Sequence, residues 1–198
     1  MIKLLVSLLV ITLPVFASNV GISSIPLSEY KNMFSLEYNQ QLSGSSNPGM
    51  QVQYLFSATK KIGFDAGLRI ATDDFLGFVA GASYEVLPDY NNQPRFSVRA
   101  FYERENWDGA DFNNFGASPT VSKGFNFNSV HLYPFLALPT KISIFEDSDD
   151  VNLASSLALG FSGKIPNSKF RNIRAHIEAN INLKNTFSNL SLGASLNF

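Results

Sequence analysis

The most constraining feature of this chain is the strict alternation of apolar and polar residues over its last eight positions. The apolar positions are Leu192, Ala194, Leu196 and Phe198, and small or polar residues separate them. A period of two is typical of a β-strand with one apolar and one polar face. An apolar edge strand promotes aggregation, whereas a barrel that pairs its last strand with its first has no free edge. We therefore expect this strand to close a β-barrel by pairing with the strand near 33–42.

The same alternation recurs along the chain and predicts ten strands. The segments are 33–42, 50–59, 62–72, 75–87, 95–105, 125–138, 140–146, 151–163, 170–183 and 187–198. Most reach the length of about 9–11 residues that a transmembrane strand needs. The predicted fold class is all-β: a closed, antiparallel, up-and-down transmembrane β-barrel of ten strands. The alternative is eight strands, if 125–150 forms one strand and a long loop.

The N-terminal residues have the composition of a secretory signal. Lys3 precedes a short apolar run over 4–13, and the small residue Ala17 follows at a position that a signal peptidase can read. The run is too short for a comfortable transmembrane helix. The expected division is a signal peptide over 1–17, a periplasmic N-terminal segment over 18–32 and the barrel over 33–198.

Composition argues against several other classes. The chain has a net charge of −1 and therefore lacks the excess of basic residues that nucleic-acid-binding proteins carry. We expect no nucleic-acid partner. The chain has no cysteine, so it contains no disulfide. Phosphate-binding loops, dinucleotide fingerprints and zinc-ligand spacings do not occur in the sequence. We expect no cofactor and no metal site.

The connections between strands are expected to be short on the periplasmic side, as at 59–61, and longer outside, notably at 106–124. Trp107, Phe112 and Phe115 in that loop either form a recognition surface or fold onto an outer aromatic girdle. A second aromatic girdle is expected at the periplasmic rim. Its members are Phe34, Phe56, Phe64, Tyr84, Phe96, Phe161 and Phe198. The acidic run Glu146, Asp147, Asp149 and Asp150 is a solvated turn or a divalent-cation site.

Charged residues occupy the polar face of the predicted strands, which points inward in a membrane barrel. The predicted lumen network comprises Glu37, Asp65, Arg69, Glu85, Arg95, Arg99, Glu103, Arg174, His176 and Glu178. Opposite charges in a narrow space should pair, because an unpaired buried charge is costly. Arginine suits this role, since its planar fork binds carboxylates at two points. We expect a plugged or narrow lumen; a charged constriction that selects small solutes is the alternative.

A catalytic site is a third hypothesis. Ser129, His131 and either Glu178 or Glu103 would supply a nucleophile, a base and an orienting carboxylate. Some outer-membrane lipases and lipid deacylases use such groups on a barrel wall. Their His-x-Ser order is reversed here, however, because the sequence reads Ser-x-His. The residues therefore favour a protein that is not an enzyme.

The two ends of the chain and the alternating pattern between them resemble the small bacterial outer-membrane barrels of OmpA/OmpX type. Ser191, Gly193, Leu196 and Phe198 match the four positions of the C-terminal assembly signal of such barrels. The resemblance implies a bacterial outer-membrane location, with membrane lipid, lipopolysaccharide and the barrel-assembly machinery as partners. The function that it implies is a non-enzymatic barrel with a plugged or narrow lumen and with surface loops for envelope or partner contact. The alternatives are a narrow channel for small or apolar solutes and, third, an envelope-lipid-modifying enzyme. The oligomeric state stays open.

Overall fold

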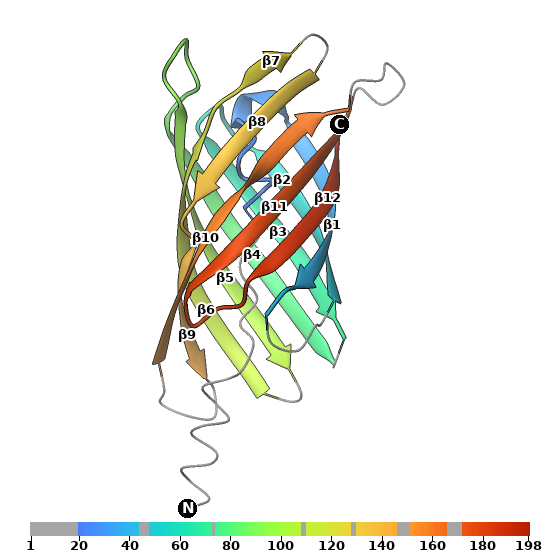
Figure 1. The fold of residues 1–198 in the computed structure, drawn as a ribbon, viewed down its shortest axis with the longest axis vertical. Coiled ribbons are helices and arrows are strands. Elements are labelled where there is room, and N and C mark those ends of the chain that lie inside the picture. Colours follow the sequence, from blue (N-terminus) through green and yellow to red (C-terminus); the bar gives the residue numbers. More distant parts are fainter. Residues whose placement is uncertain are drawn as a thin grey trace, which may run out of the picture.

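Antiparallel strands make up most of the molecule. The computed structural model describes residues 20–43, 48–72, 74–107, 110–127, 130–145, 151–165 and 172–198, without the side chain of Trp107. The elements are η1 (Leu27–Glu29), β1 (Asn32–Gln41), β2 (Pro48–Ser57), β3 (Ile62–Ala71), β4 (Phe75–Leu87), β5 (Arg95–Trp107), β6 (Ala110–Ser122), β7 (Phe125–Phe127), β8 (Val130–Ala137), β9 (Thr140–Phe145), β10 (Val151–Lys164), β11 (Ile173–Lys184) and β12 (Asn189–Asn197). They form one closed sheet around a central lumen (Figure 1).

The first and last strands close the barrel, as the terminal alternation predicts. β1 and β12 pair antiparallel from Met33 opposite Asn197 to Gln41 opposite Asn189. The amide of Phe198 donates to the carbonyl of Asn32 at 3.1 Å, so pairing continues to the last residue. We call the end of the barrel where β1 begins and β12 ends the proximal mouth. The opposite end is the distal mouth.

The predicted number of ten strands is confirmed. Two pairs of consecutive elements, β8 with β9 and β6 with β7, each follow the path of one strand. Thr140 of β9 and Ala137 of β8 pair with β6 in a single register, opposite Ala117 and Thr120, so β8 and β9 are one strand interrupted before Pro139. β7 continues the register of β6, since Phe125 pairs with Leu132. The alternative of eight strands is therefore wrong.

The middle of the chain differs from its predicted segmentation. The expected exterior loop over 106–124 is wrong, because 110–122 form β6, which pairs with β5 along its whole length. The two strands expected over 125–138 and 140–146 are also wrong, since 130–145 form one strand. Asp111 and Asn113 on the outward side of β6 bond to β5, Asp111 to Arg104 and Asn113 to Tyr102. These polar residues interrupt the alternation by which a strand is recognised.

The barrel is apolar outside and polar inside. Outward residues such as Leu68 (56% exposed) and Phe64 (51%) present apolar side chains around the wall, whereas Glu37 on the inner face is 1% exposed. This is the inverse of a soluble sheet and matches the arrangement of a membrane barrel. No helix in the described part of the chain is long and apolar enough to cross a membrane.

The described residues before β1 lie inside the barrel. Residues 20–31, which we call the plug segment, form turns and the single helical turn η1. Figure 1 shows this segment in blue within the proximal part of the barrel. Val20, Ile22 and Ile25 are at most 2% exposed. The sequence-based division assigned 18–32 to the periplasm; the structure shows that 20–31 fill the proximal mouth.

Candidate functional site

All ten residues of the predicted lumen network face the interior of the barrel. Their exposed fractions lie between 1% and 7%. They come from β1, β3, β4, β5 and β11, and their side chains lie on the inner face of these strands. The structure groups them into separate clusters along the lumen rather than into one chain of contacts.

The cluster nearest the distal mouth contains four charged residues from three strands. Arg69 of β3 donates to Glu103 at 3.3 Å and to Glu105 at 3.0 Å, both on β5. Lys141 of β9 lies 2.7 Å from Glu103 and 3.7 Å from Glu105. Two cations thus face two carboxylates, and Asn114 of β6 donates to the second oxygen of Glu105 at 2.9 Å. The cluster is electrically balanced and joins β3, β5, β6 and β9 across the lumen.

Aromatic rings adjoin this cluster. Phe112 and Phe145 lie edge to face, with ring centroids 5.0 Å apart and planes at 77°. Phe112 is buried, so it belongs to the lumen and not to an exterior recognition surface. Phe115 is 52% exposed on the outer wall, where its ring lies 5.1 Å from that of Tyr102. The role expected for these aromatic residues as one loop surface is therefore wrong.

Two further ion pairs lie nearer the proximal mouth, one in the middle of the lumen and one beside the plug segment. Arg99 donates to Asp65 from Nε at 2.9 Å and from Nη2 at 2.5 Å, which is a two-point contact. Gln53 donates to the same carboxylate at 2.7 Å. Arg95 donates from Nε to Glu85 at 2.7 Å. Each guanidinium is buried with its carboxylate, as charge pairing in a narrow lumen requires.

Glycines on the inner wall make room for these side chains. Gly193 of β12 lies directly between Glu37 of β1 and His176 of β11 in the strand register. The His176 imidazole passes over it and comes within 3.3 Å of Glu37, and a Cβ at Gly193 would overlap the ring. Gly81 of β4 lies beneath the Asp65–Arg99 pair in a similar way. A Cβ added at Gly81 would lie 2.8 Å from Arg99 Nε. Polar side chains on alternate strands thus approach each other over an intervening glycine.

The plug segment is held largely through its backbone by side chains of the wall. Glu178 accepts hydrogen bonds from the amides of Val20, at 2.8 Å, and Gly21. Arg95 donates to the carbonyls of Ser23 at 2.9 Å and Ser24 at 3.3 Å. Three serine hydroxyls donate to plug carbonyls: Ser162 to Gly21 at 2.8 Å, Ser122 to Ser24 at 3.0 Å and Ser57 to Leu27 at 2.8 Å. These bonds give hydrogen-bond partners to backbone groups that are buried away from water.

Apolar contacts add to this attachment. Ile22 and Ile25 form a buried cluster with Met33 and Leu55, and Tyr30 packs against it. Leu27 packs on Gly63 of β3. A Cβ added at Gly63 would lie only 2.6 Å from the Leu27 side chain, so a larger residue would not fit there. The segment therefore contributes a small hydrophobic core to the proximal half of the lumen.

The end of the plug segment carries a charged contact. Glu29 lies 2.7 Å from Arg174 and 3.2 Å from Lys164. Burial raises the pKa of Glu29, but the hydrogen bond from Arg174 and the two positive charges outweigh it, so the pKa lies below its usual range. The carboxylate form therefore favours the docked segment.

Four charged residues of these clusters are missing from the sequence-based network, namely Glu29, Glu105, Lys141 and the partly exposed Lys164. Glu105 shares the inward parity of Arg95, Arg99 and Glu103, so the alternation contains the signal that identifies it. Lys141 lies in the short predicted segment 140–146, where the alternation does not show which face of the strand its side chain occupies. Glu29 precedes the first strand, and no strand periodicity applies to it.

The proposed catalytic residues do not form a site in the described part of the chain. Ser129 lies outside the described residues. His131 stacks on Tyr133, with ring centroids 4.7 Å apart. Glu103 bonds to Arg69 and Lys141, and Glu178 holds the plug segment. No group of three or more potential metal ligands occurs among the described residues, and the acidic run over 146–150 lies outside them.

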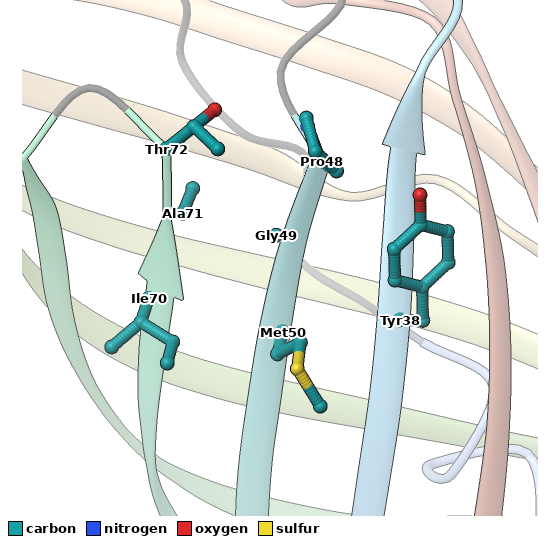
Figure 2. Close-up of a pocket in the computed structure, with 7 residues that line it drawn as sticks. All are labelled: Tyr38, Pro48, Gly49, Met50, Ile70, Ala71 and Thr72. Carbon is teal, nitrogen blue, oxygen red and sulfur yellow. The ribbon is translucent and has the colours of Figure 1, made fainter.

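Two of the shallow apolar grooves on the described part of the outer wall are the following. One, of about 360 Å³, lies near the distal mouth over β1, β2 and β3. Figure 2 shows Tyr38, Met50 and Ile70 on these three strands, with Gly49 next to Met50 on β2 and Ala71 next to Ile70 on β3. The other, of about 370 Å³, includes Phe161, Gly163 and Ala175 near the proximal mouth. Both belong to the apolar exterior rather than to the lumen.

The residues predicted for the periplasmic girdle lie toward the proximal ends of their strands. Phe34 and Phe64 lie near the start of β1 and β3, and Tyr84 lies near the end of β4. Phe198 follows β12, and its ring centroid lies 6.4 Å from that of Tyr54. The structure thus gathers these aromatic side chains at one end of the barrel. Their contact with a membrane interface stays a prediction.

Comparisons with known proteins give likenesses of structure. No protein-family model matches the sequence, and no curated protein matches it. A designed transmembrane β-barrel is similar, with a TM-score of 0.43 and 8% identity, covering 84% of this chain and 94% of its own. The KdgM porin, in complex with disordered oligogalacturonate, has a TM-score of 0.44 and 10% identity, covering 84% and 99%. Omp33, an outer membrane protein of Acinetobacter baumannii, has a TM-score of 0.42 and 6% identity, covering 85% and 98%.

Proposed function

We propose that this protein is an integral outer-membrane β-barrel, not an enzyme, whose lumen is closed to solutes by its own N-terminal segment and by charged side chains of the wall. The observation that carries the proposal is the plug segment. Residues 20–31 occupy the proximal mouth and are bonded to β2, β5, β6, β10 and β11. A solute entering from this end would have to displace a packed piece of the chain.

The wall supports the second half of the proposal. Beyond the plug segment, the ion pairs of Arg99 with Asp65 and of Arg69 and Lys141 with Glu103 and Glu105 extend between alternate strands. Breaking them to pass a solute would leave buried charges unpaired, which is costly. The apolar exterior favours a membrane location, and the terminal sequence signals favour the outer membrane. Outer-membrane lipid, lipopolysaccharide and the assembly machinery remain the partners that the sequence predicts.

The alternative is a narrow channel, and single-channel recording in planar bilayers separates the two. The mature protein is refolded in detergent, and its folded state is checked by a shift in gel mobility on boiling. We expect no steady conductance from the folded protein. Steady conductance steps would overturn the closed lumen and support the channel. A protein that stays soluble without detergent and shows no mobility shift would contradict the membrane assignment.

A further inference from the structure

The grooves near the distal and the proximal mouth differ in the charge of their lining. The groove near the distal mouth is lined by seven residues, none of which is charged. The groove near the proximal mouth, which we call the proximal groove, reaches Lys164, the last residue of β10. His176 also contributes to its lining, but the imidazole faces Glu37 inside the lumen. The proximal groove therefore joins an apolar surface to one positive charge at the end of the barrel.

Two small residues form the floor of the proximal groove. Gly163 of β10 pairs with Ala175 of β11, so two positions without a large side chain lie side by side. Phe161 and Ile177 form the next outward pair toward the middle of the barrel, and both are more than 40% exposed. Large side chains beside a pair of small ones leave a depression in the membrane-facing wall. A hydrocarbon chain that lies in this depression gains van der Waals contact on several sides.

The charges at the proximal end of this groove do not balance. Lys164 and Arg174 face a single carboxylate, that of Glu29, at 3.2 Å and 2.7 Å. No other carboxylate of the described residues lies within 4.0 Å of either cation. Nε and Nη1 of Arg174 also have no hydrogen-bond partner among the described residues. The Lys164 side chain is 40% exposed and that of Arg174 only 1%, so Lys164 is the cation that an external anion can reach.

An apolar groove that ends at an excess positive charge fits a lipid with a negatively charged headgroup. We propose that the proximal groove binds one anionic phospholipid, with an acyl chain over Gly163 and Ala175 and the headgroup phosphate at Lys164. The phosphate of such a lipid lies at the membrane–water interface, and its acyl chains extend into the apolar region, as the positions of Lys164 and the groove require. The inference rests on the proposed membrane barrel and names the lipid class and the place at which it binds.

The test counts the lipids that stay bound to the folded protein. The mature protein in detergent is titrated with phosphatidylglycerol or with phosphatidylcholine of the same acyl chains, and native mass spectrometry resolves each bound lipid. We expect the first phosphatidylglycerol to bind about fivefold more tightly than phosphatidylcholine, which is the contribution of one lysine near a membrane surface. Equal affinities for the two lipids would overturn the proposal.

A competitor separates the lipid from its headgroup. Glycerol 3-phosphate carries the phosphate without the acyl chains, so it can reach Lys164 but cannot fill the groove. We expect no displacement of phosphatidylglycerol when the two are present at equal concentration. Displacement under these conditions would show that Lys164 binds phosphate alone, and the acyl-chain part of the proposal would be wrong.

One pair of variants tests the charge. Lys164→Gln should reduce the preference for phosphatidylglycerol to less than about twofold, because the exposed cation is lost. The control is Lys61→Gln, which removes an exposed lysine from the turn between β2 and β3 at the same mouth. This control should retain the full preference. Equal losses in the two variants would show a general attraction to the basic mouth and would overturn the site.

A second pair tests the groove. Ala175→Leu fills the floor of the groove and should weaken the binding of both lipids about fivefold or more, because the chain loses its contacts. Ala82→Leu places the same side chain on the exposed outer face of β4 and should leave both affinities unchanged. The gel-mobility shift on boiling checks that each variant is folded. Equal effects of the two leucine variants would overturn the groove as the binding place.

The outcomes keep this inference separate from the proposed function. A protein that is soluble without detergent would refute the membrane barrel and the lipid site with it. Steady conductance would refute the closed lumen and leave the lipid site in place. A silent, heat-modifiable barrel with equal affinities for the two lipids would refute only the lipid site. A dimer in the mass spectra that Ala175→Leu dissociates would assign the groove to a second copy of the chain and overturn the proposal.

Discussion

The two halves of the lumen are filled in different ways. The proximal half contains the plug segment, which contributes Ile22, Ile25 and Leu27 and is bound mainly through its backbone. The distal half is filled by side chains of the wall itself, namely the cluster of Arg69, Glu103, Glu105 and Lys141 and the adjoining phenyl rings. The proximal half is closed by a segment that precedes β1 and forms no strand of the barrel. The distal half is closed by side chains of the strands that form the barrel.

This difference determines which half can open alone. The plug segment can leave the lumen without breaking a strand pair, so its opening is a local event with its own free energy. The distal cluster joins strands that are not neighbours, so disturbing it affects the barrel as a whole. Changes in the distal half should therefore alter global unfolding, and changes in the proximal half should alter only the attachment of residues 20–31.

The largest effect is expected from Arg69→Met. The substitution leaves Glu103 and Glu105 with one shared cation, Lys141, and removal of one partner of a buried ion pair costs about 3–5 kcal/mol. Urea unfolding in detergent, followed by gel mobility, measures this loss in the free energy of unfolding. The control is Arg104→Met, which removes an exposed pair with Asp111 and should cost less than about 1 kcal/mol. Equal losses in both variants would contradict the role of the distal cluster.

A smaller and local effect is expected from Ile25→Ala. The side chain is 1% exposed against Ile22, Met33 and Leu55, and its truncation should weaken plug docking by about 2–3 kcal/mol. Hydrogen exchange of residues 20–31 should accelerate, while the urea midpoint of the barrel stays unchanged. A matching fall in the urea midpoint would show that the plug segment and the barrel unfold together, and the comparison of the two halves would fail.

The smallest effect concerns the pH dependence of plug attachment. Because the pKa of Glu29 is lowered in the folded protein, its contribution is complete above the usual carboxyl pKa and is lost as the pH falls through the lower folded value. The protection of plug-segment amides, which is their exchange rate relative to the intrinsic rate at the same pH, should thus fall on acidification from about pH 7 to about pH 3. Glu29→Gln should remove part of this dependence and leave the part due to other carboxylates. An identical pH profile in wild type and variant would contradict the contribution of Glu29.

The sequence predicts the strands of the N-terminal and C-terminal parts of the chain well and those of its middle poorly. β1 to β5 and β10 to β12 alternate cleanly, since each residue meets either the apolar exterior or the polar lumen. In β6, Asp111 and Asn113 face outward but bond to Arg104 and Tyr102, and Pro119 further weakens the strand signal. These residues form a strand because they pair with neighbours on both sides, and that pairing is not a local property.

The alternation by itself determines that the chain forms β-strands and that the ten predicted lumen charges share the polar face of these strands; the barrel and its closure are predicted from the alternation together with the two ends of the chain. Facing follows from the period of two along each strand, which a local sequence contains. Tertiary structure alone decides what meets inside: that Gly193 admits His176 toward Glu37, that Lys141 completes the distal cluster, and that residues 20–31 return into the lumen. These contacts join residues distant in sequence, and their partners are set by strand register and by the width of the closed barrel.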